Sequence, residues 1–311
     1  MVNKMSWTDK KEMNTEKLEI MTYEERRNKI REQLATRLAQ DRAFLCCSIS
    51  GNPKTGKSGT AMDCRTEEEI KKGMKIRVLD LDDGCTPTWH SAWNKDENIE
   101  IYVPIEYRKD GSVDWIETFE NCHVWLDETK EMIVEGNIKA AILDGVDKVN
   151  EGSSDALREY LVKDAKRTGQ IIHDTDSLKV KALDWRIRNK IHDRVINPFL
   201  ALQCDRFFVT HMKPIYDGVA IPIPVGFEPD WHKSVPQKML QMIKITERKK
   251  GNDTEYVARL DSCKTNPSFV GKEWVVFRVS SDGNVWLGIP ELQTGFNNDP
   301  RLRVTLHDEE E

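Results

Sequence analysis

Short apolar runs recur along the first two thirds of the chain and alternate with longer amphipathic stretches. The first run, residues 43–49, is continuous and is bounded by Gly51 and Pro53, which is typical of a strand buried on both faces. Similar runs predict strands at about 75–81, 99–105, 138–143 and 205–210. Helical stretches lie between the strands, at about 57–72, either continuous or broken, and at 114–134, 153–167 and 186–202. This alternation predicts an α/β protein with a mostly parallel sheet flanked by helices.

The hydrophobic pattern changes after residue 238. From there to about residue 290, alternating residues and short turns predict a meander with strands at 239–247, 254–263, 273–279 and 284–289. Consecutive strands joined by such short turns must run antiparallel. We therefore expect an antiparallel C-terminal extension (239–290) of the same sheet.

At the N-terminus, Thr22 and Glu25 form a capping box that precedes an apolar stripe at i+4 spacing, made of Ile30, Leu34 and Leu38. The pattern predicts a helix over about 22–41. Its single stripe suits packing either on the chain's own core or on a neighbouring subunit. We divide the chain into three parts: an N-terminal helical extension (1–41), a core domain (42–290) and an acidic tail (291–311).

The composition narrows the class of protein. Charged residues make up 32% of the 311 positions, and no apolar run approaches the roughly 20 residues that a membrane helix needs. The N-terminus is charged and lacks the apolar centre of a secretory signal. Seven cysteines, an odd number without a C-x-x-C pair, argue against a disulfide framework and a structural zinc site. We expect a cytoplasmic protein with reduced thiols and no membrane association.

The most specific chemical signal is at residues 51–58, which fit G-x-x-x-x-G-K-[ST] between a buried strand and a helix. In this pattern backbone amides surround the phosphates of a nucleotide, the lysine contacts the β and γ oxygens, and the hydroxyl ligates Mg²⁺. We expect ATP and Mg²⁺ as cofactors, with Lys57 on the phosphates and Ser58 on the metal. The residues expected around the nucleotide are Gly51, Asn52, Pro53, Lys54, Thr55, Gly56, Lys57, Ser58 and Gly59.

Two apolar strands that end in carboxylates are candidates to complete this site. One ends at Asp144, which is expected to hold Mg²⁺ together with Ser58. The other runs into a cluster of three aspartates, Asp80, Asp82 and Asp83. In one class of P-loop ATPase, the strand beside the P-loop strand supplies the carboxylate that polarises the attacking water, which makes Asp82 the candidate base. The alternative for each of the three aspartates is a place in a solvated turn.

The order of these parts resembles the RecA-like ATPase core, in particular the short phage and viral nucleotide-binding proteins of that superfamily linked to single-strand annealing and recombination. The resemblance covers about residues 43–280. It rests on the P-loop followed by the strands 78–82, 142–144 and 206–211, and only the P-loop is specific by itself. The resemblance implies an ATPase that assembles as a homo-oligomer, a ring or a filament, on single-stranded DNA.

The C-terminal strand pair resembles the pair that, in RecA-like proteins, carries lysines to the ATP of a neighbouring subunit. Lys264 falls on the first lysine position, and Asn266 stands where recombinases typically have a second. Asp82 replaces the catalytic glutamate of the family. Because aspartate is one methylene shorter, slow hydrolysis is expected, although Asp83 or Glu128 could substitute.

Thr210 and His211 end the strand at which RecA-like proteins keep a polar residue that senses the γ-phosphate. The resemblance implies the same role for these two side chains. The alternative is hydrogen bonding at a strand end, because buried polar groups usually find partners for structural reasons alone.

The net charge of −6 gives no overall attraction to nucleic acid, so binding would depend on a local concentration of Lys and Arg. Residues 158–194 carry ten Lys or Arg against six Asp or Glu, and the long loop 212–237 lies at the position of a DNA-binding loop of RecA-like proteins. Trp185 suits stacking on an unpaired base, or else packs in the core. The candidate nucleic-acid contacts are Trp185, Arg186, Arg188, Lys213, Trp231 and Lys233.

Several functions remain open at this point. The leading hypothesis is an ATPase acting on single-stranded DNA in recombination, annealing or replication. A ring-shaped DNA translocase or packaging motor is an alternative, in which Arg248 or Arg259 would act across the subunit interface. A nucleotide-gated binding module with little hydrolysis is another, since Asp82 replaces glutamate. A small-molecule kinase is disfavoured, because the sequence has no Arg-rich lid and its C-terminal third is rich in strands.

Overall fold

The computed structural model describes residues 22–38, 43–168, 180–181, 183–216, 224–281 and 283–296. Its contacts divide the chain into two compact units, Met1–Ala43 and Phe44–Glu311. The first unit contains helix α2 (Tyr23–Leu38), which starts at the predicted capping box. The Glu25 N–H donates to Thr22 Oγ1 over 3.2 Å, and the Thr22 N–H donates to Glu25 Oε2 over 2.6 Å. Ile30 and Leu34 of the predicted apolar stripe are exposed.

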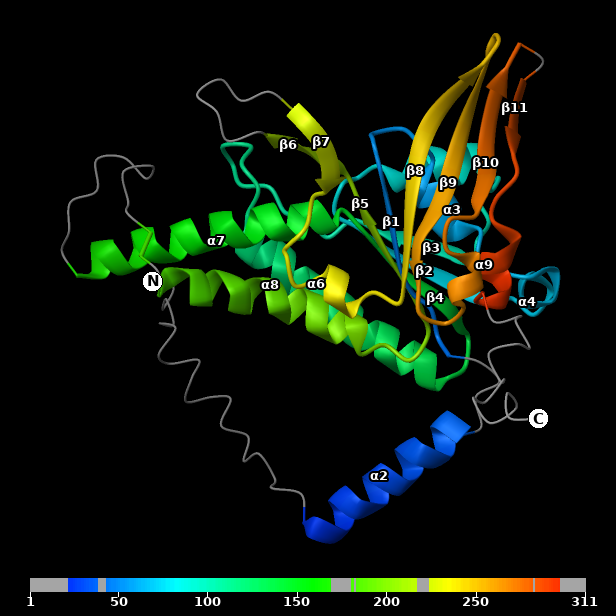
Figure 1. The fold of residues 1–311 in the computed structure, drawn as a ribbon. Coiled ribbons are helices and arrows are strands. Elements are labelled where there is room, and N and C mark those ends of the chain that lie inside the picture. Colours follow the sequence, from blue (N-terminus) through cyan, green and yellow to red (C-terminus); the bar gives the residue numbers. More distant parts are fainter. Residues whose placement is uncertain are drawn as a thin grey trace, which may run out of the picture. The chain divides into compact units, whose positions relative to one another are not determined.

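Within the described residues of the second unit, nine strands form one mixed sheet (Figure 1). Five parallel strands alternate with helices along the chain: β1 (Cys46–Gly51), β2 (Lys75–Asp80), β3 (Ile99–Tyr102), β4 (Ile138–Asp144) and β5 (Asp205–Thr210). β8 (Gln241–Lys250) joins β1 in parallel, and an antiparallel extension follows: β9 (Asp253–Cys263), β10 (Glu273–Ser280) and β11 (Gly283–Trp286). The predicted α/β fold class, with its antiparallel C-terminal extension, is confirmed.

Helices cover both faces of the sheet, because alternate residues of a buried strand point to opposite faces. In β1, Cys47 and Ile49 pack into one core cluster with Met62, whereas Cys46 packs into a second cluster with Phe199. The first cluster includes residues of α3 (Lys57–Met62), α5 (Cys85–Ala92) and α9 (Pro290–Thr294). The second includes residues of α6 (Trp115–Val134), α7 (Val146–Arg167) and α8 (Asp184–Leu200).

The strand order is β11-β10-β9-β8-β1-β5-β4-β2-β3. β5 lies beside the P-loop strand β1, and β2 is separated from β1 by β5 and β4. Asp82 therefore does not follow the strand beside the P-loop strand, contrary to the sequence-based expectation. Because parallel strands end at one edge, the strand ends still meet: Asp80 pairs with Asp144, and Ser50 pairs with Thr210.

The structure refines the predicted elements in several local segments. Over 57–72 the structure has the broken form of the predicted helix, with α3 followed by α4 (Glu67–Lys71). The helix predicted from 153 begins at Val146. The loop predicted at 212–237 contains the hairpin of β6 (Met212–Tyr216) and β7 (Pro224–Pro229). Helix α5 was not predicted, because its eight residues have no clear apolar stripe. Leu292 and Phe296 are fully buried, so the packed core extends past residue 290.

Two expectations from composition can be compared with these elements. Across the described parts of the chain, no helix is both long enough and apolar enough to cross a membrane. All seven cysteines are free and buried. Buried thiols of this kind behave as small apolar side chains and fill the core.

Candidate functional site

The P-loop turns at the carboxyl edge of β1 through two residues with left-handed backbones. Lys54 has a φ of 64° and Gly56 has a φ of 82°, and Gly56 is the N-cap residue directly before α3. Lys57, Ser58 and Gly59 form the first turn of α3, so their N–H groups lack partners within the helix. The segment predicted to bind phosphate therefore adopts a loop that leaves backbone donors at the sheet edge.

Lys57 supplies a buried cation to this loop. Lys57 is 6% exposed, and its Nζ donates a hydrogen bond of 2.9 Å to the carbonyl oxygen of Asn52 within the same loop. Burial lowers the pKa of Lys57, although the nearby carboxylates of Asp144, Asp147 and Asp82 favour the charged form. The ammonium is thus held among the loop carbonyl and the acidic strand ends.

Ser58 and Asp144 are in direct contact, although 86 positions separate them in the sequence. The Ser58 hydroxyl donates a hydrogen bond of 2.5 Å to Asp144 Oδ2, and the Cys85 thiol donates to the same oxygen over 3.0 Å. Asp144 is 4% exposed, and burial raises its pKa to about 6 despite these two hydrogen bonds. The raised pKa means that burial destabilises the negative charge of Asp144 more than its hydrogen bonds stabilise it, and a bound cation would stabilise that charge.

These two oxygens fit the chemistry of Mg²⁺, which prefers hydroxyl and carboxylate ligands and usually retains several waters. Asp80, Cys85 and Asp144 also place one donor atom each within 4.8 Å of one another. A thiol is a soft ligand that suits Mg²⁺ poorly. Asp80 is fully buried and accepts hydrogen bonds from the N–H groups of Asp82, Gly84 and Cys85, so it shapes the turn after β2. Ser58 and Asp144 are the residues that would hold Mg²⁺.

The other predicted groups at this edge are also brought together. Asp82 Oδ2 lies 3.6 Å from His211 Nε2. Thr210 Oγ1 donates to the carbonyl oxygen of Asp230 over 2.7 Å. Glu128, by contrast, pairs with Arg77 in the middle of β2, away from the edge. The candidate base and the two candidate sensors therefore lie at the P-loop edge of the sheet, and Glu128 does not.

An aromatic side chain that the sequence analysis did not identify borders the P-loop. A Cβ atom added at Gly59 would lie 2.7 Å from Cη2 of Trp286, and one at Gly56 would lie 3.3 Å from Cζ3 of the same ring. Trp286 Nε1 donates to Asp63, and its ring meets that of Trp93 edge-on at 5.2 Å. Gly59 is therefore needed for the close approach of the Trp286 indole. Nothing in the sequence around Trp286 indicates that this tryptophan contacts the P-loop.

Lys264 lies at the ends of the strands that are opposite the P-loop. Cys263, the last residue of β9, pairs with Gln241, which pairs with Cys47 near the start of β1. Lys264 is exposed there, about 16 Å along the strands from the P-loop at the usual rise per residue. It is thus remote from its own chain's P-loop. Asn266 is fully buried and accepts hydrogen bonds from Ser268, so its side chain is structural.

The six candidate nucleic-acid residues do not form one surface. Trp185, 49% exposed, and Arg186 lie on the exposed part of α8, and Lys233 is exposed elsewhere. Arg188 is 5% exposed and hydrogen-bonds Asn150 of α7, and Trp231 is 8% exposed and packs in the core. Lys213 lies 3.6 Å from Glu228 and 3.4 Å from Asp230. Arg188 and Trp231 hold the fold together, which leaves Trp185, Arg186 and Lys233 available to a partner.

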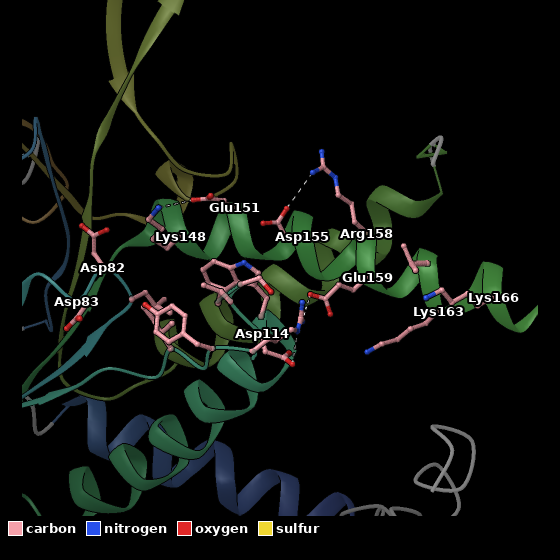
Figure 2. Close-up of a pocket in the computed structure, with 18 residues that line it drawn as sticks. Asp82, Asp83, Asp114, Lys148, Glu151, Asp155, Arg158, Glu159, Lys163 and Lys166 are labelled. Carbon is pink, nitrogen blue, oxygen red and sulfur yellow. Dashed lines mark hydrogen bonds and ion pairs between the residues drawn. The ribbon is translucent and has the colours of Figure 1, made fainter. Parts of the chain in front are cut away.

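A polar cavity of about 880 Å³ opens beside Asp82 and Asp83 and follows α7 (Figure 2). Its lining carries six carboxylates and five cationic side chains. Several of them pair within the cavity, including Lys148 with Glu151 and Asp155 with Arg158. The carboxylates outnumber the cations by one, so the lining has no net positive charge that would attract a polyanion such as DNA.

A scan of protein-family models finds no match for this chain, and a search of curated proteins finds none either. The similar solved structures include a KaiC-like protein from the hyperthermophilic archaeon Pyrococcus horikoshii OT3, with 11% sequence identity and a TM-score of 0.42 over 78% of this chain and 88% of that one. RadB recombinase is similar at 8% identity and a TM-score of 0.38, over 82% of this chain and 96% of that one. Such low similarity carries no functional argument, so the function is inferred from this chain's own residues.

Proposed function

We propose that this chain binds ATP with Mg²⁺, hydrolyses it, and acts as a homo-oligomer on single-stranded DNA in recombination, annealing or replication. The observation that carries the proposal is the 2.5 Å contact of Ser58 Oγ with Asp144 Oδ2, beside the buried ammonium of Lys57. A cation, a hydroxyl and a carboxylate thus meet beside the backbone donors of the first turn of α3. This combination suits a triphosphate with a divalent cation.

Each residue has a defined role in this proposal. The loop amides and Lys57 bind the phosphate oxygens, and Ser58 and Asp144 hold Mg²⁺, which neutralises charge on the phosphates when bound. Asp82 orients the attacking water. Thr210 and His211 respond to the γ-phosphate at the end of β5.

Exposed residues of α8 support the DNA part of the proposal. Trp185 presents half of its surface, and Arg186 follows it on the same helix. An aromatic ring stacked on a base contributes about 1–3 kcal/mol, and the neighbouring guanidinium can contact phosphate. The exposed surface of α8 therefore offers an aromatic ring for base stacking and a cation for a phosphate, the two contacts that bind single-stranded DNA.

Turnover of ATP with and without a single-stranded oligonucleotide tests this function. We expect the oligonucleotide to raise turnover, and Trp185→Ala to weaken oligonucleotide binding by about 5- to 160-fold, as expected for the loss of one stacked base. Tyr160→Ala, which removes an exposed aromatic from α7, is the matched control. Absence of oligonucleotide binding contradicts the DNA part of the proposal.

A second candidate function is a nucleotide-gated binding module, which Asp82 in place of glutamate favours. Normal MgATP binding with negligible turnover indicates this second candidate.

Lys264→Ala is expected to leave MgATP affinity unchanged and to lower turnover about tenfold or more. The reason is that Lys264, at the far edge of the sheet, serves a neighbouring subunit's nucleotide, where a cation stabilises charge developing on the phosphate. Steady-state kinetics at several protein concentrations measure the effect. Lys109→Ala, another exposed lysine, is the control. Wild-type turnover in Lys264→Ala contradicts the assignment.

A further inference from the structure

Three ionisable side chains from three separate elements meet at the P-loop edge. His211, directly after β5, lies between Asp147 of α7 and Asp82 of the turn after β2. His211 Nδ1 is 3.3 Å from Asp147 Oδ2, and His211 Nε2 is 3.6 Å from Asp82 Oδ2. Each ring nitrogen therefore faces a different carboxylate.

The backbone around His211 holds its ring in this place. The His211 carbonyl oxygen accepts a hydrogen bond of 2.8 Å from the Asp230 N–H, and Thr210 Oγ1 donates to the Asp230 carbonyl oxygen. Asp147 is the second residue of α7, which starts after Gly145 in a left-handed conformation with a φ of 89°. This start directs the first turn of α7 back to the strand ends, and Asp147 Oδ1 also lies 3.4 Å from Thr210 Oγ1.

His211 hydrogen-bonds Asp147 through Nδ1 and faces Asp82 at ion-pair distance through Nε2, and an imidazole placed in this way between two carboxylates is stabilised with a proton on both nitrogens. The charged groups that face His211 are Asp147, Asp82 and Lys57. The hydrogen bond to Asp147 raises the pKa of His211, Asp82 adds to this effect, and burial and Lys57 oppose it. Burial alone would raise the pKa of Asp147, but the hydrogen bond and charge of His211 lower it. The geometry and the charges both favour an imidazolium at this position.

We propose that Asp147 is a positioning residue for ATP hydrolysis: it keeps His211 doubly protonated, so that the charged ring holds the carboxylate of Asp82 in place by ion pairing through Nε2. This inference rests on the proposed function. It explains how Asp82 can align the attacking water despite its shorter side chain, because a carboxylate held in one orientation needs less reorganisation.

Asp147→Asn tests the inference, because it keeps the shape of the side chain and removes its charge. We expect kcat to fall about tenfold while the Kd of MgATP changes less than about twofold. The imidazolium is lost as pH rises through the pKa of His211, and removing the opposite charge of Asp147 lowers that pKa. The alkaline loss of kcat should therefore occur at a lower pH in the variant. NMR titration of His211 measures the same shift without turnover.

Asp147→Glu, which restores the charge, should recover part of the turnover and the original pH profile. Asp155→Asn removes a carboxylate further along α7 and serves as the control. A pH profile and a His211 titration that are unchanged in Asp147→Asn overturn the inference while leaving the ATPase in place. Absence of MgATP binding in the wild-type protein overturns the proposed function, and this inference with it.

Discussion

Lys57→Ala is expected to lower the affinity for MgATP at least about 100-fold. The Lys57 ammonium is buried in the P-loop and donates a hydrogen bond to the Asn52 carbonyl, which places it to exchange this contact for phosphate oxygens. A hydrogen bond involving a charged group contributes about 1.5–3 kcal/mol, and two such contacts with the β and γ oxygens account for the loss. Equilibrium binding of a fluorescent ATP analogue measures it.

The fold should survive this change, because a buried ammonium with a lowered pKa costs free energy in the absence of its ligand. Thermal unfolding of the nucleotide-free variant should therefore show a Tm no lower than that of the wild-type protein. Lys71→Ala removes an exposed lysine of α4 and should bind MgATP normally. An affinity within threefold of wild type in Lys57→Ala would refute the assignment of residues 51–58.

Asp144→Asn should have two opposite effects on stability. The amide cannot hold Mg²⁺ as a carboxylate does, so the rise in Tm that MgATP gives to the wild-type protein should be lost. In EDTA without nucleotide the variant should be the more stable protein at pH 7.5, by about 1–4 kcal/mol. The range includes the value of about 3 kcal/mol that follows from the pKa of Asp144, about 6 in the folded chain against an ordinary value of 3.8, at about 1.36 kcal/mol per pKa unit.

The same pKa determines the sign of a pH dependence in the metal-free protein. Between about pH 4 and 6 the folded chain binds more protons at Asp144 than the unfolded chain does. Its contribution to the free energy of unfolding therefore decreases as pH rises through this window and is constant above it. The difference between wild type and Asp144→Asn should shrink at pH 4. A wild-type protein more stable than Asp144→Asn in EDTA at pH 7.5 contradicts the account. Asp164→Asn, on the surface of α7, is the control.

The strands were predictable because they are buried on both faces and so appear as continuous apolar runs, as in β1 and β4. The P-loop was predictable because its glycines and lysine serve one local backbone geometry. The order of the strands was not, since nothing local distinguishes β5 from β2 as the neighbour of β1. The short helix α5 and the hairpin of β6 and β7 lack the length over which hydrophobic periodicity becomes clear.

Contacts across the sheet edge explain most of what sequence reasoning missed. Asp147 and His211 are 64 positions apart, and only the parallel arrangement of β4 and β5 brings them together. Trp286 reaches Gly59 because the antiparallel extension returns beside α3. Arg188 and Trp231 looked suited to DNA by residue type, but their positions on core-facing sides of their segments bury them. Residue type indicated chemistry, and packing decided which side chains are accessible.

The contact of Ser58 and Asp144 beside Lys57 is the centre of this account, and calorimetric titration of the wild-type protein with ATP tests it most directly. In the presence of Mg²⁺ we predict one binding site per chain, with an affinity that falls at least about tenfold when EDTA removes the metal. No detectable binding, or binding of equal strength with and without Mg²⁺, would contradict the account.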